Sequence, residues 1–215
     1  IILINLNASA EEVNINNRDS IKYIGYLRKN IEYNYNKISL SVPQIKYEMP
    51  SLKKSVFGWL GNYAGISGYL NPFTGEAQIN ARIPLFYQPA VASHEVAHQL
   101  GYSSETEANF IGFLSAFDSP NPAFRYAAYY DIFMYGIREM YRRDSLRAGE
   151  IWIRVHPRVQ KDRAEFREYL RKYRSILSPL VSGVYDSYLK ANEQQSGINS
   201  YEEVVGLLIA WYRKQ

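Results

Sequence analysis

The sequence predicts an α+β fold that is mostly helical, with a small β-sheet upstream of a long series of helices. Helical patterns separated by glycine and proline breaks dominate from residue 89 onward. A turn-rich stretch with short alternating runs, GISGYLNPFTGEAQINARIPLF (65–86), precedes them. The chain has 215 residues, enough for one good core, so we expect a single domain over 1–215.

The first half of the chain is expected to contain one helix and a small sheet. Isoleucine and leucine residues recur at helical spacing within 18–37. Pro43 and Pro50 break the following segment into extended pieces. Asn-Pro and Thr-Gly turn signals within 71–75 then predict a hairpin whose second strand runs over 76–83.

The rest of the chain is expected to be helical. Gly101 is placed to end the first of these helices, and Pro179 to open the sixth. The expected helices span 89–100, 104–117, 122–142, 145–154, 160–175, 178–192 and 200–213.

Composition excludes several classes of protein. With 47% hydrophobic and 21% charged residues, the chain is globular rather than disordered. The net charge is +4, but basic and acidic residues alternate, as in KDRAEFREYLRKYR (161–174), which is typical of a solvated helix face. We therefore expect no nucleic-acid partner. There are no cysteines, which excludes disulfides, thiolate zinc sites and cysteine catalysis, and no apolar run reaches the length of a membrane span.

The segment SHEVAHQLGYSSETEANFIGF (93–113) carries the chemistry. It contains two of the three histidines, His94 and His98, four residues apart. On a helix these two side chains share one face, where their imidazoles can bind one Zn²⁺. Glu95 lies beside the first histidine, in position to accept a proton from a water that zinc activates. This HExxH pattern predicts a catalytic zinc site.

A catalytic zinc needs a third protein ligand, and a nearby carboxylate is the natural choice. Gly101 allows a sharp turn after the histidine helix, which brings Glu105 and Glu107 within reach. These two side chains point in different directions on a helix, so one of them is expected to meet the metal. We favour Glu105, with Glu107 as the alternative, because Glu105 shares its face with small residues that permit close helix packing. Those residues are Ala108, Asn109, Gly112 and Ala116.

The motifs HEVAHQLG, GYLNPFTGEAQIN and ETEANF together resemble the gluzincins, the zincin-type metallopeptidases with a glutamate ligand. More narrowly, they resemble a group of bacterial membrane-linked proteins in which HExxHQxG is followed closely by ExEANF. The C-terminal YDSYLKANEQQSGINSYEEVVGLLIAWY is also similar to that group, so the resemblance covers the chain from about residue 65 to the end.

The resemblance implies a zincin-like metallopeptidase fold with one Zn²⁺ per chain. Glu105 matches the metal ligand, Ala108 the small position and Asn109 a polar residue that supports a zinc-bound histidine. The sequence departs from the gluzincin pattern in two ways, a shorter gap between His98 and Glu105 and asparagine in place of aspartate at the support position. Within the domain we expect an N-terminal helix and sheet, the metal-binding helices and a helical C-terminal part, over about 1–87, 88–118 and 119–215.

The resemblance also implies a membrane link through an N-terminal segment that precedes this chain. The chain opens with IILINLNASA and no methionine, as a piece of a longer protein would. It is then expected to be the soluble catalytic portion of a membrane-associated protein. The absence of cysteine favours an extracytoplasmic side.

The expected reaction is hydrolysis of a peptide or protein substrate, with Glu95 as general base. An extended peptide would add to an exposed sheet edge, for which the segment Glu76–Ile83 is the candidate. The alternative is that this segment is a structural hairpin and binds no substrate. A donor to the oxyanion is also needed, and His156, Tyr185 and Tyr201 are the candidates. Exposure to solvent is the alternative for His156, which lies before a proline.

Two other functions compete with the peptidase. One is a zinc-binding sensor or interaction domain that keeps a zincin fold without turnover. The other is a helical interaction domain in which His94 and His98 bind no metal. The intact Glu95 favours the peptidase, because its evident role beside such a site is proton transfer.

Overall fold

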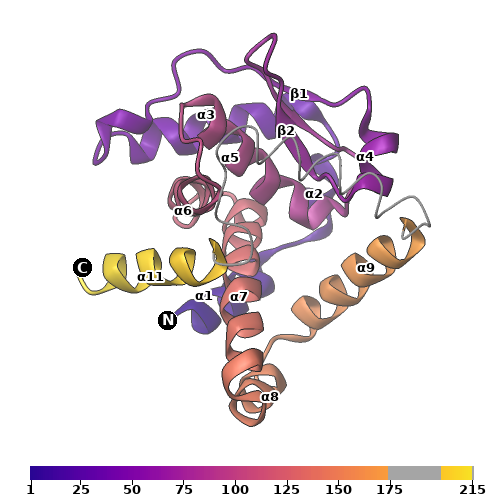
Figure 1. Ribbon diagram of the computed structural model, residues 1–215, viewed down its shortest axis with the longest axis vertical. Helices are drawn as coiled ribbons and strands as arrows, with labels where there is room; N and C mark the ends of the chain where they lie inside the picture. The colour runs from indigo at the N-terminus through magenta and orange to yellow at the C-terminus, as the bar shows by residue number, and fades with distance from the viewer. Residues whose placement is uncertain (174–199, 215) are drawn as a thin grey trace.

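The computed structural model describes residues 1–173 and 200–214, which form a mostly helical molecule with one small sheet (Figure 1). The predicted α+β class is therefore confirmed, whereas the finer zincin-like fold stays a prediction. The elements are α1 (Ile2–Glu12), α2 (Ile15–Ser20), α3 (Ile24–Ile38), η1 (Pro43–Ile45), β1 (Leu52–Lys54), α4 (Gly58–Ala64), β2 (Gly68–Leu70), β3 (Ala77–Ile79), η2 (Leu85–Tyr87), α5 (Gln88–Gln99), α6 (Glu105–Ala116), α7 (Pro122–Arg143), α8 (Ser145–Ile153), α9 (Pro157–Tyr173) and α11 (Ser200–Tyr212).

The sheet has the strand order β1-β3-β2, so β3 is its central strand. β2 and β3 form the predicted antiparallel hairpin, with Gly68 opposite Ile79. β1 pairs with the other side of β3 in parallel, with Leu52 opposite Ala77. The prediction that Glu76–Ile83 forms an exposed edge is therefore wrong, because β1, in the extended segment after Pro50, pairs with the side of β3 that β2 leaves open. The edge strands are β1 and β2.

Most of the predicted helices are confirmed to within three residues at each end. The single helix expected over 18–37 is instead two, because α2 ends at Ser20 and α3 begins at Ile24. Two helices were not expected. α1 buries only Leu6, Ser9 and Ala10, too narrow a stripe for a clear helical pattern, and α4 is short and rich in glycine. The helix expected over 178–192 lies outside the described residues.

Buried contacts join the N-terminal helices to the C-terminal ones. α1 packs along α7, and α2 reaches α9 through Arg18. The carboxylate of Asp162 on α9 is fully buried and accepts hydrogen bonds from Arg18 and from the Tyr126 hydroxyl of α7, both at 2.7 Å. These two donors compensate the buried negative charge of Asp162. The cluster joins the helices α2, α7 and α9.

No helix in residues 1–173 or 200–214 combines the length and the apolar character needed to cross a membrane. The expected membrane link through a preceding segment stays a prediction.

The helix pair α5 and α6 lies between the sheet and α7 (Figure 1). α5 packs against β2 and β3 on one side and against α6 and α7 on the others. Val96 and Ala97 of α5 are fully buried. The histidine helix of the 93–113 motif is therefore held between the sheet and the helices α6 and α7.

Candidate metal centre

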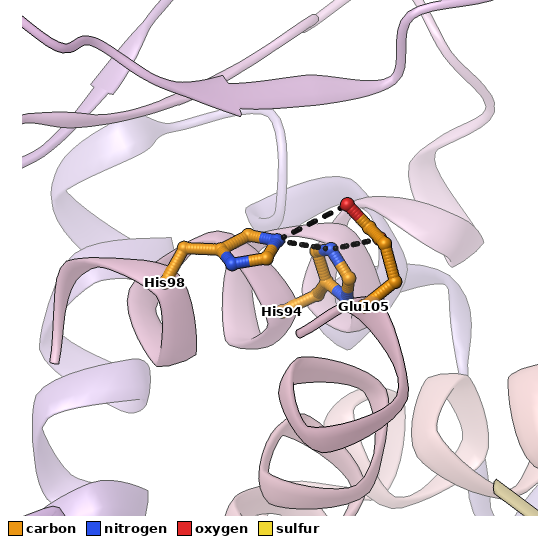
Figure 2. Close-up of side chains that lie close together, drawn as sticks. All are labelled: His94, His98 and Glu105. Carbon is orange, nitrogen blue, oxygen red and sulfur yellow. Dashed lines mark hydrogen bonds and ion pairs between the residues drawn. The ribbon is translucent and has the colours of Figure 1, made fainter. Parts of the chain in front are cut away.

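His94 and His98 lie one turn apart on α5, and their rings face the same side (Figure 2). Their Nε2 atoms are 3.0 Å apart. The Nδ1 atom of His98 lies 2.7 Å from the carbonyl oxygen of Tyr102, to which it donates when Nε2 carries the lone pair. The backbone thus orients the His98 ring with Nε2 directed at His94 and leaves that atom free to act as a ligand.

The turn after α5 brings Glu105 to the two histidines. Gly101 adopts φ +100°, a left-handed conformation that glycine takes without strain, and α6 begins with Glu105 four residues later. The Glu105 carboxylate lies 3.3 Å from Nε2 of His94 and 3.5 Å from Nε2 of His98 (Figure 2). Glu107 is exposed instead. Of the two predicted alternatives, the structure brings Glu105 to the histidines.

Small residues let α6 approach α5 closely enough for this contact. A β-carbon on Gly112 would lie 3.1 Å from the backbone nitrogen of His94, which is tighter than ordinary packing allows. Ala108 and Ala116 on the same face are buried. The predicted small-residue face is confirmed, and it fixes the distance between the carboxylate and the imidazoles.

His94 and Glu105 shift each other's pKa in opposite directions. Burial would lower the pKa of His94, but its hydrogen bond to Glu105 and the charges of Glu95 and Glu105 raise it to about 9. Burial would raise the pKa of Glu105, but its contacts with both histidines hold it well below the usual range for a carboxyl. The carboxylate is therefore ionised and favours positive charge between itself and the rings, which a divalent cation would supply.

The donor set fits zinc. One ligand atom from each of His94, His98 and Glu105 can be chosen so that all three lie within 4.8 Å of one another. Two imidazole nitrogens and one carboxylate oxygen are the ligand set of one class of catalytic zinc sites, which keep a fourth position for water or substrate. Among the described residues, no other group of three such side chains lies close enough to hold an ion.

Glu95 lies beneath the edge strand β2, next to the cluster. Its side chain is buried, and a β-carbon on Gly68 would lie 2.6 Å from its Oε1 atom. Burial raises the pKa of Glu95 to about 7, against the opposing charges of His94 and His98. A carboxyl with a pKa near neutrality can both accept and return a proton, as general acid–base catalysis requires.

Comparison with known families places this chain. The family model described as "Protein of unknown function (DUF3810)" matches residues 1–209. The chain belongs to this family. No curated protein and no solved structure matches it. The function of this DUF3810 member is therefore argued from the chemistry of its own site.

The other predicted site residues fare differently. Asn109 borders a small cavity together with His94. The predicted hydrogen bond from Asn109 to a zinc-bound histidine is not made directly, because Nδ1 of His94 has no partner and Nδ1 of His98 is paired with the Tyr102 carbonyl. Tyr185 lies outside the described residues, as does the side chain of Tyr201. The helix that carries Tyr201, α11, packs against α6, where Glu203 accepts a hydrogen bond of 2.9 Å from Thr106.

The hydrogen bonds of His156 are with residues outside the metal centre, and its assignment as an oxyanion donor stays a prediction. It lies in the connection between α8 and α9, the helices that follow α7 (Figure 1). Its backbone N–H donates to Asn7, and its Nδ1 accepts from the backbone of Arg158. The proline that follows it opens α9, so the ring serves the start of that helix.

Three residues near the site were missed by the sequence analysis. Gly68 makes room for Glu95, Tyr102 orients His98 through its carbonyl, and Asp131 on α7 borders the cavity beside His94. Tyr102 acts through its backbone carbonyl, which every residue type has, so its side chain gives no signal of this role. The GISGY turn did mark Gly68 as a glycine next to a strand, a position where another group often approaches closely.

Substituting Gly68 by alanine is expected to displace the Glu95 side chain, and a displacement of about 1 Å lowers the rate of a reaction that depends on the displaced group by about 100-fold. The new methyl would overlap the Glu95 carboxylate at the distance given above. Zinc content should be unchanged, since Gly68 touches no ligand. Gly25→Ala is the control, because no atom lies within 4 Å of a β-carbon there. Equal activity of Gly68→Ala and Gly25→Ala would show that the activity does not depend on the present position of Glu95.

Proposed function

We propose that this chain is a zinc-dependent metallopeptidase. The observation that supports it most directly is the convergence of His94, His98 and Glu105 on one point, with the buried Glu95 beside them. A structural site would need only ligands. A buried carboxylate beside the three candidate ligands, and outside their group, is instead suited to proton transfer.

Each residue has a defined role in the proposed reaction. His94, His98 and Glu105 would hold the metal. When bound, zinc would polarise the carbonyl of the scissile bond and lower the pKa of the attacking water. Glu95 would take a proton from that water as its oxygen bonds to the carbonyl carbon, and would deliver the proton to the amine nitrogen as the C–N bond breaks.

The edge strand β2 is the proposed docking site for the substrate backbone. Within the described residues β2 pairs only with β3, so its outer hydrogen-bonding groups are available to an extended peptide. Gly68 places β2 directly above Glu95. A peptide added to this edge would therefore pass close to the proposed general base. The segment Glu76–Ile83 cannot take this role, because it contains the central strand β3, which is paired on both sides.

A peptide library incubated with the zinc-loaded chain tests the proposal. Cleavage is expected, with loss of activity in a zinc chelator and recovery when zinc is returned. Zinc binding without cleavage of any library peptide or unfolded protein would leave a zinc-binding sensor or interaction module. Absence of zinc binding would overturn both functions and leave the helical interaction domain.

A further inference from the structure

The two histidines of the centre are supported in different ways. Nδ1 of His98 has the Tyr102 carbonyl as its partner. Nδ1 of His94 is buried and has none. A buried imidazole N–H without a partner costs about 1–3 kcal/mol, so a group that pairs with it is to be expected nearby.

A small cavity lies beside this ring. It is about the size of one water molecule, and its walls come from α5, α6 and α7. Two of its lining residues besides His94 are polar, Asp131 and Asn109. The full lining is Ala90, His94, Asn109, Gly112, Phe113, Ala128 and Asp131. A water needs two to four polar partners to occupy a buried site, and this cavity offers three.

Asp131 is held at the cavity by its own partner. The Tyr87 hydroxyl donates a hydrogen bond of 2.8 Å to Oδ1 of Asp131. Burial raises the pKa of Asp131 to about 6, with the Tyr87 hydrogen bond and the His94 charge acting in the opposite direction. The side chain is therefore held by Tyr87 at the wall of the cavity that it shares with His94.

We propose that Asp131 is a positioning residue that orients His94 for metal binding through one water in this cavity. Nδ1–H of His94 donates to the water, which donates in turn to the Asp131 carboxylate and to the side-chain oxygen of Asn109. The proposal rests on the metal role assigned to His94 above. It names α7, through Asp131, as a support of the centre.

The physical reason is the tautomer of the ring. A neutral imidazole carries one N–H, and the hydrogen bond made by one nitrogen decides which nitrogen keeps a lone pair for the metal. A carboxylate acceptor behind Nδ1 keeps the proton there and raises the basicity of Nε2, the atom that faces Glu105. His98 obtains the same tautomer from a backbone carbonyl, which no side-chain substitution can remove.

Zinc affinity, measured by competition with a chromophoric chelator, tests this role. Asp131→Asn is expected to weaken zinc binding by about 10–100-fold, the usual effect of losing an outer partner of a metal-bound histidine. Asp131→Glu keeps the carboxylate and is expected to retain binding to within a few-fold. Visible spectra of the cobalt-substituted proteins should differ between Asp131→Asn and the wild type, because the His94 ligand is reoriented.

A second variant tests the water itself. Ala128→Val places methyl groups in the cavity while Asp131 stays intact. It is expected to weaken zinc binding to a similar extent, because the water is displaced and Nδ1–H loses its partner. This variant carries the test even where Asp131→Asn does not fold.

Asp162→Asn is the matched control. Asp162 is also a buried carboxylate that accepts a hydrogen bond from a tyrosine, Tyr126, but it lies on α9 in a cluster with Arg18. Its substitution should lower the thermal midpoint and leave zinc affinity unchanged. Wild-type zinc affinity in both Asp131→Asn and Ala128→Val would overturn the inference alone. A wild-type chain that binds no zinc would overturn the proposed function with it.

Discussion

Replacing Glu105 by glutamine is expected to leave the protein without bound zinc, whereas Glu107→Gln should retain about one zinc per chain. The amide that replaces Glu105 removes the anion that contacts both histidines and is a much weaker ligand. The loss of affinity should exceed the roughly 10–100-fold effect of an outer partner. Glu107 is two residues away on the same helix, carries the same charge and faces solvent.

The measurement is elemental analysis of each purified variant after zinc loading and dialysis. His94→Ala and His98→Ala should behave like Glu105→Gln, with one ligand removed in each. The Glu107 variant controls for the loss of one negative charge at the start of α6, so only a ligand role separates the two glutamates. Zinc retained by Glu105→Gln and lost by Glu107→Gln would reverse the assignment.

The metal cluster was predictable because its geometry is local. The i, i+4 spacing fixes His94 and His98 on one helix face whatever the rest of the fold does. Gly101 ends that helix, and the small residues of α6 set which of its faces packs inward. These features lie within twenty-one residues of sequence, 93–113, and they suffice to choose Glu105 over Glu107.

The strand order of the sheet and the position of Asp131 beside His94 were not predictable, because both depend on contacts between residues far apart in the sequence. β1 reaches β3 across more than twenty residues, so the pairing that makes β3 central leaves no mark in the alternating pattern of the strand itself. Asp131 looks like an ordinary polar residue of a long helix. Its position at the cavity follows only from how α7 packs against α5.

The N-terminal helices show the same limit. The Arg18–Asp162 ion pair joins residues 144 positions apart, and neither residue type signals the other. His156 was a candidate oxyanion donor by residue type, and residue type does not reveal its neighbours in the fold. The contacts of its backbone and ring with Asn7 and Arg158 account for its position instead.

Glu95→Gln is expected to lower kcat/KM for peptide hydrolysis by about 10²–10⁴-fold, the usual contribution of a general base, while zinc binding is retained. Glutamine is nearly the same size, so it fits beneath Gly68, but it cannot accept a proton from water at neutral pH. The loss should appear in kcat, because Glu95 acts on the reacting water rather than on substrate affinity.

This variant separates catalysis from metal binding because the two functions reside in different side chains. Zinc content and thermal midpoint serve as controls, and both should match the wild type or exceed it, since a buried carboxyl with a raised pKa is replaced by a neutral amide. Glu95→Asp keeps the carboxylate but shortens its reach, so it should retain part of the activity. Full activity in Glu95→Gln would mean that another group removes the proton. Zinc loss in the same variant would instead assign Glu95 to the metal.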